Sequence, residues 1–365
     1  MLRGDILEYR ARRRSRRAAS RRRAKAGPCL AGRLEREAEP RHDFRRKQVA
    51  AAALLVLTAV LVLVWPVKGL AEESAQHATA SRLATKTLLL DVARAGERLV
   101  AVGEWGHVLL SDDGGKTWRQ AQSVPTRMTL TELAFVDARQ GWAVGHDAVV
   151  LHTSDGGETW ELQFSAPEDE ATLLSVWFEN ADHGIAVGSF GLAIETRDGG
   201  RSWEPRTLIE DEDPPHLNHL FAGPEDTLFI AAEFAWVYRS RDGGRSWERF
   251  RPPYEGSFWG GMPLGGSGVL VFGMRGHAFR SEDLGERWQE LDTGTNQSLQ
   301  DATRLVGGGI VMVGLGGVVV TSADGGHTFT AAVEADRRGI AAVAEGADGA
   351  LLLFGEAGIK TRPAR

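Results

Sequence analysis

Cysteine is nearly absent from this chain, since Cys29 is the only one among 365 residues. A single thiol excludes an internal disulfide, and the composition suits an oxidising compartment without requiring one. The histidines are scattered, and no carboxylates show the alternate spacing and terminal glutamate of an EF-hand loop. No glycine-rich phosphate loop is present, because the glycine pairs fall in hairpins. The sequence therefore predicts neither a metal nor a cofactor.

Charged side chains are missing altogether from residues 49–67. A run of about 20 apolar residues is long enough to cross a bilayer. Basic residues at 45–47 precede this run and Glu72 and Glu73 follow it, so the positive-inside rule leaves the N-terminus in the cytoplasm. Residues 1–47 carry 17 basic and 6 acidic side chains, whereas the remainder carries 26 and 43.

These features predict four parts. They are a disordered Arg-rich cytoplasmic tail (1–47), a transmembrane helix or signal-anchor (48–67), a linker (68–80) and a folded domain (81–361). The expected location is the inner (plasma) membrane, with one pass and with the folded domain on the periplasmic, extracytoplasmic side.

The apolar run and the basic tail leave alternatives open. The run is either an uncleaved anchor or the hydrophobic part of a signal peptide cut after Ala71, a small residue that follows Gly69 by two positions. The tail is a solvated segment or a wrongly chosen upstream start, an arm for RNA or lipid, or a twin-arginine signal at Arg45-Arg46. It lacks interleaved aromatic residues, which argues against nucleic-acid binding.

Six copies of one eight-residue phrase dominate the rest of the chain. They are SDDGGKTW (111–118), TSDGGETW (153–160), TRDGGRSW (196–203), SRDGGRSW (240–247), SEDLGERW (281–288) and SADGGHTF (322–329). A period near 40 residues with glycine turns and short apolar runs is typical of four-stranded propeller blades. In each copy the aspartate can accept backbone amides, and the glycines allow the positive φ of a tight hairpin. The leucine in the fifth copy, Leu284, predicts a distorted turn.

Each blade is predicted to run as strand, strand, variable turn, strand, aspartate hairpin and strand. A seventh unit begins after Arg338 and stops before any hairpin, so we expect three strands there. Residues 81–87 are the available donor of a fourth strand, which would close the ring between the two ends. The prediction is thus an all-β, seven-bladed β-propeller. A six-bladed ring remains an alternative, with 338–365 as a packed tail.

Hairpins of this kind resemble the Asp-box, or BNR, repeats of sialidases, which makes a glycoside hydrolase one alternative. Such an enzyme needs a tyrosine nucleophile supported by a glutamate, and the chain has three tyrosines. Tyr9 precedes the apolar run and Tyr238 falls at a core position of the repeat, so Tyr254 is the one candidate. Its neighbour Glu255 points to the other side of an extended segment. The sequence therefore favours a protein that is not an enzyme.

A binding face is expected where the blades differ from one another. The turns between the second and third strands emerge on the same face as the connections between blades. Large or polar residues occupy these positions, and a partner is predicted to contact Trp105, His146, Phe190, Phe234, Tyr254, Trp259 and Arg275. The alternative is that the aromatic rings fold over the channel mouth as a plug.

The repeat at 172–203, TLLSVWFENADHGIAVGSFGLAIETRDGGRSW, resembles those of the photosystem II stability and assembly factor family. The resemblance covers most of the chain, from about 88 to 360. It implies a non-catalytic propeller that holds membrane-protein subunits during assembly. We expect a monomeric propeller that binds no nucleic acid. An exported glycan-binding or sialidase-like propeller is the alternative.

Overall fold

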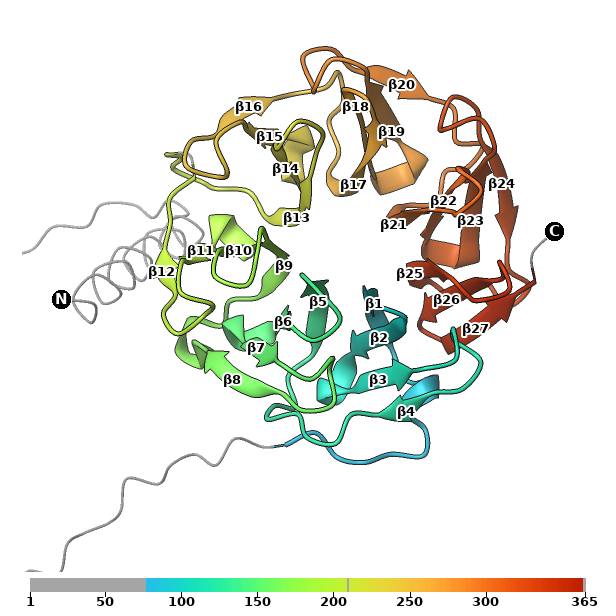
Figure 1. Cartoon of the computed structure of the whole chain (residues 1–365). Helices are drawn as coiled ribbons and strands as arrows, with labels where there is room; N and C mark the ends of the chain where they lie inside the picture. The colour runs from blue at the N-terminus through green and yellow to red at the C-terminus, as the bar shows by residue number, and fades with distance from the viewer. Residues whose placement is uncertain (1–76, 209, 364–365) are drawn as a thin grey trace, which may run out of the picture. The chain divides into compact units, whose positions relative to one another are not determined.

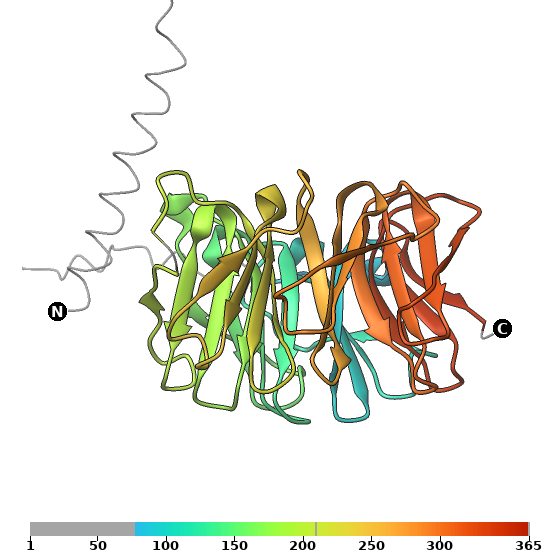
Figure 2. The same cartoon turned by 90° about the horizontal axis from the view of Figure 1, so that it is seen from above.

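The computed structural model describes residues 77–208 and 210–363. The predicted tail and membrane helix lie outside these residues, and within them no helix is long and apolar enough to cross a membrane. The described part forms seven antiparallel sheets around a central channel (Figure 1). The all-β, seven-bladed prediction is confirmed. Figure 2 shows the strands running between two faces that carry the turns and loops.

Blades 1–4 contain four strands each, in chain order from the channel outward. Their strands are β1 (Leu89–Ala95), β2 (Arg98–Gly103), β3 (Val108–Ser111), β4 (Arg119–Gln120), β5 (Leu130–Phe135), β6 (Gly141–Gly145), β7 (Val150–Thr153), β8 (Glu161–Phe164), β9 (Leu173–Phe178), β10 (Gly184–Gly188), β11 (Ala193–Thr196), β12 (Glu204–Pro205), β13 (Leu217–Ala222), β14 (Leu228–Ala232), β15 (Val237–Ser240) and β16 (Glu248–Phe250).

Blades 5 and 6 also have four strands and blade 7 has three. Their strands are β17 (Phe258–Gly265), β18 (Gly268–Gly273), β19 (Ala278–Ser281), β20 (Gln289–Leu291), β21 (Leu299–Arg304), β22 (Ile310–Gly314), β23 (Val318–Ser322), β24 (Thr330–Val333), β25 (Ile340–Glu345), β26 (Leu351–Gly355) and β27 (Gly358–Arg362). Short 3-10 turns complete the description: η1 (Ala84–Lys86), η2 (Glu104–Gly106), η3 (His146–Ala148), η4 (Pro167–Asp169), η5 (Ser189–Gly191), η6 (Glu233–Ala235), η7 (Met274–Gly276) and η8 (Leu315–Gly317).

The aspartate hairpins join the third and fourth strands of blades 1–6, and side chains satisfy their backbone groups. In blade 4, Ser240 Oγ donates to Asp242 Oδ1 (2.8 Å) and accepts from the Gly244 amide (2.8 Å). The Asp242 carboxylate also accepts from the Ser246 hydroxyl (2.6 Å) and amide (2.9 Å), and these bonds hold its pKa at about 2. Trp247 Nε1 donates to the Gly244 carbonyl (3.0 Å), which fixes the indole beside the hairpin.

The fifth hairpin keeps the shape of the others despite its leucine, so the expected distortion is wrong. Leu284 has φ +57° and Gly285 has φ +88°, in the same left-handed region as the glycine pairs of the other copies. This conformation costs an L-residue about 1–2 kcal/mol. The Leu284 side chain is buried in the core between blades 4 and 5, and this burial offsets the strain.

The ring closes by packing of blade 7 on blade 1, and the expectation that 81–87 supply a strand is wrong. These residues form a bend and η1, and no fourth strand joins β25–β27 among the described residues. Phe354 of β26 packs edge-on against Trp118 with ring centroids 5.6 Å apart. A Cβ on Gly358 would lie 2.1 Å from the Thr85 carbonyl, as one on Gly106 would meet the loop at Thr126. Residues 81–88 therefore take the place of an inter-blade loop.

Candidate binding face and channel

The turn face is defined by η2, η3, η5, η6, η7 and η8, which join the second and third strands of blades 1–6, together with the inter-blade loops beside them. The middle residue of every one of these turns has a positive φ of 55–64°. Glycine fits this conformation and blade 6 has Gly316 there, while blade 2 has Asp147. Three other blades have an aromatic residue at this position.

These three aromatic residues combine a strained backbone with an exposed side chain. Trp105, Phe190 and Phe234 have φ values of 62°, 55° and 57°, and remain 61%, 50% and 51% exposed. The left-handed backbone costs about 1–2 kcal/mol at each position, and half-exposed rings recover little of it by burial. A strained backbone that carries an exposed aromatic side chain makes these three positions candidates for a functional site.

The remaining predicted contact residues divide between the turn face and the interior. His146 and Arg275 are exposed on the turn face, in η3 and η7. Tyr254 is packed instead: its hydroxyl donates to the Met274 carbonyl (2.9 Å) and its ring lies 4.6 Å from that of His277. Trp259 lines the central channel rather than the outer surface. The structure thus brings five of the seven predicted residues to one exposed face.

Phe190 and Phe234 belong to one continuous cluster on blades 3 and 4. The Phe190 ring meets the edge of the His216 ring, with centroids 4.5 Å apart. The His216 amide donates to Glu233 Oε2 (2.9 Å), and the Glu233 amide donates back to the His216 carbonyl (3.1 Å). Glu233 directly precedes Phe234 in η6. One ring contact and two hydrogen bonds therefore connect Phe190 to the turn that carries Phe234.

Glutamate at the first turn position has a structural role that the sequence interpretation missed. Glu104 and Glu356 accept the amides of Leu88 (3.1 Å) and Gly339 (3.1 Å), as Glu233 does in blade 4. Each glutamate thereby ties a turn to the segment entering its own blade. The sequence signal that could have indicated this role is the recurrence of glutamate at the same turn position in three blades.

The central channel is a cavity of about 420 Å³ whose wall follows one repeated irregularity. Every innermost strand has a bulge at its second position, where one residue is skipped in the pairing. All seven bulged residues line the channel: Leu90, Thr131, Leu174, Asn218, Trp259, Gln300 and Ala341. The bulge explains why Trp259 points inward.

In five of the seven blades, the side chain of the residue after the bulge accepts amides at the open inner edge of the ring. Asp91 and Glu132 accept amides of the following blades, from Leu133 (2.7 Å) and Val176 (3.4 Å). Asp301 accepts the amide of its neighbour Ala302 (2.7 Å) and the Val343 amide of blade 7 (2.8 Å). The corresponding residues of blades 3 and 4, Ser175 and His219, likewise accept amides of the following blades. Five side chains thus satisfy inner-edge amides across the ring.

Burial changes the pKa values of these channel residues. It raises the pKa of Asp91 to about 6, and burial together with the Asp91 charge raises that of Asp301 to about 7. Burial also raises the pKa of Glu132 well above its usual value and lowers that of His219 to about 4. Because the carboxylates are engaged by backbone amides, the observed geometry gives them a structural role.

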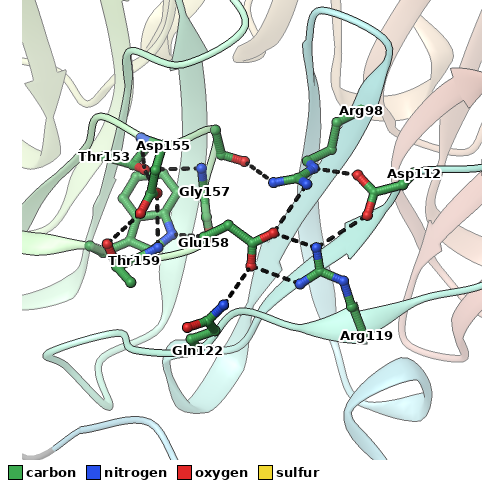
Figure 3. A network of polar contacts seen from close by, with 11 residues as sticks. Arg98, Asp112, Arg119, Gln122, Thr153, Asp155, Gly157, Glu158 and Thr159 are labelled. Carbon is green, nitrogen blue, oxygen red and sulfur yellow. Dashed lines mark hydrogen bonds and ion pairs between the residues drawn. The ribbon is translucent and has the colours of Figure 1, made fainter.

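A second set of links joins neighbouring blades near the hairpins (Figure 3). Arg98 of blade 1 donates to the Gly156 carbonyl of blade 2 (3.0 Å) and to Asp112 (2.5 Å). Arg119 joins Asp112 to Glu158 of blade 2 by ion pairs. Equivalent carbonyls accept from the preceding blade at Gly199, Leu284 and Gly325. Among the described residues no group of His, Cys, Asp or Glu has the arrangement of a metal site.

Comparison with known proteins places this architecture in a family. The family model described as photosynthesis system II assembly factor YCF48 matches residues 120–171 and 163–351. A search of curated proteins gives no significant match. The structure titled YCF48 bound to D1 peptide is similar with a TM-score of 0.62 and 19% identity, covering 79% of this chain and 96% of that one.

Two further solved structures share the propeller fold. YCF48 from Cyanidioschyzon merolae has a TM-score of 0.60 and 16% identity, covering 78% of this chain and 97% of that one. A streptogramin B lyase has a TM-score of 0.64 and 13% identity, covering 79% and 97%. At these identities the structures show the fold alone, whereas the family model spans more than half of the sequence. The chain belongs to the photosynthesis system II assembly factor YCF48 family.

Proposed function

We propose that this protein is a non-catalytic scaffold that holds a membrane-protein subunit during assembly, with the turn face as its contact surface. The observation that carries the proposal is the set of Trp105, Phe190 and Phe234, which are strained in backbone and exposed in side chain. Exposed aromatic side chains on one face are typical of protein interaction sites. Their exposure supports binding over a plug of the channel.

The predicted membrane helix at 48–67 would keep the propeller at the extracytoplasmic surface of the inner membrane, close to such a subunit. The solved structure titled YCF48 bound to D1 peptide carries a peptide on a propeller of this family, which supports a polypeptide partner. Tyr254 is the candidate nucleophile of the hydrolase alternative. Its hydroxyl donates a hydrogen bond to the Met274 carbonyl, and burial raises its pKa. Both features oppose nucleophilic attack.

The test is affinity capture from detergent-solubilised membranes with the full chain. Replacing Trp105, Phe190 and Phe234 together by asparagine keeps a residue that tolerates positive φ, and it should abolish capture of a stoichiometric membrane protein. The control makes the same replacement at Leu162 and Val306, two exposed apolar residues of β8 and of the β21–β22 turn, and should leave capture unchanged. Capture that survives the triple substitution, or glycan-array binding without a protein partner, contradicts the proposal.

A further inference from the structure

The turn face is strongly acidic over blades 2–4. The loops at 165–172 and 206–216 carry seven carboxylates and one basic residue, Arg206. Arg206 is committed to Glu195 inside blade 3, and Arg249 pairs with Asp211 (3.0 Å). Elsewhere on the turn face the loops are nearly balanced: the loop at 334–339 has two acidic and two basic residues, and that at 121–129 has only Arg127.

The acidic loops lie on both sides of η5, the turn that carries Phe190. Thr172, at the end of the first loop, exchanges hydrogen bonds with Ser189 of η5. The Pro215 carbonyl of the second loop accepts the Gly191 amide at the other end of η5 (2.8 Å). Phe190, between them, is therefore an apolar contact with carboxylates to either side.

We propose that this sector of the turn face binds a polypeptide segment of the partner in which lysine or arginine side chains alternate with apolar ones. The inference rests on the proposed function and names the chemistry of its partner. Apolar side chains of the segment pack on Phe190 and Phe234, and its cations face the carboxylates and the aromatic rings. An anionic segment would meet like charge in the two acidic loops beside Phe190.

The test uses fluorescently labelled synthetic peptides in which lysines and leucines are spaced by glycine and serine, and a matched set with glutamate in place of lysine. The lysine peptide should bind the full chain with an affinity that falls steeply as salt is added. The glutamate peptide should not bind. Glu212→Lys with Asp213→Lys should weaken binding about tenfold or more.

The matched control is Glu97→Lys with Asp182→Lys, which makes the same change of charge in turns on the opposite face. This control should leave binding within about twofold of wild type. Equal loss in both double variants, no loss in either, or preference for the glutamate peptide overturns the inference. One outcome is that the triple aromatic variant loses the membrane partner while the Glu212→Lys, Asp213→Lys variant keeps it. In that case the scaffold role stands, and the inference of a cationic partner segment is wrong. If the lysine peptide binds but no membrane partner is captured, the scaffold role fails instead.

Discussion

Asp301→Asn should change how the stability of the propeller depends on pH. Asp301 lies in the channel, where burial and the Asp91 charge raise its pKa from 3.8 to about 7. Between these two values the folded chain binds more protons than the unfolded chain. Stability from this group is therefore fully present below about pH 4 and is lost as the pH rises through 7. Asparagine resembles the protonated carboxyl group and does not titrate.

The magnitude follows from the size of the pKa shift. One pKa unit corresponds to about 1.4 kcal/mol, so the shift of Asp301 corresponds to at most about 4 kcal/mol. Asp301 lines the channel and is partly exposed there, which lowers this value, so we expect about 2–4 kcal/mol. The difference in unfolding free energy between variant and wild type should move in favour of the variant by this amount from pH 4 to pH 8.

Urea unfolding followed by tryptophan fluorescence at several pH values measures this difference. Asp91 and Glu132 titrate in the same direction as Asp301, and His219, whose pKa is lowered, titrates in the opposite direction. Because the Asp301 charge repels Asp91 and helps to raise the pKa of Glu132, removing that charge also eases their ionisation in the variant, which shifts the difference in the same direction. The reasoning is refuted if the difference stays flat from pH 4 to pH 8 or moves in favour of the wild type.

Three further predictions concern the links within and between blades, each measured by urea unfolding. Ser240→Ala leaves the buried amide of the fourth hairpin without an acceptor and should cost about 1–3 kcal/mol, whereas Ser240→Thr, the residue used in two other hairpins, should cost less than about 1 kcal/mol. Arg239→Met removes the buried donor to the next hairpin and should cost about 2–4 kcal/mol, while Thr321→Ala, at the matching position before the blade without a hairpin, should be nearly neutral. Phe354→Ala at the ring closure should cost about 3–5 kcal/mol, and a cost below 1 kcal/mol would show that blade 7 contributes little to closing the ring.

Local patterns in the sequence were enough to predict the blades and most of the turn face. The aspartate phrase contains the hydroxyl and the carboxylate that bind its own hairpin amides within eight residues, so its recurrence predicts the number of hairpins and the order of strands. The turn between the second and third strands sits at a constant offset from that phrase. Trp105, Phe190 and Phe234 were therefore assigned to one face without a structure.

The tertiary structure decided what depends on contacts between blades. The sequence pattern of residues 81–87 predicted a fourth strand for blade 7. Hydrogen bonds from 77–81 to the segment at 120–124, such as that from the Ala78 amide to the Val124 carbonyl, instead hold this part of the chain as a loop beside blade 1. The bulge in each innermost strand shifts the alternation of side chains by one position, which turns Trp259 into the channel and sets Asp91 and Asp301 against amides of other blades. These contacts join residues about 42 positions apart, and no short stretch of sequence specifies them.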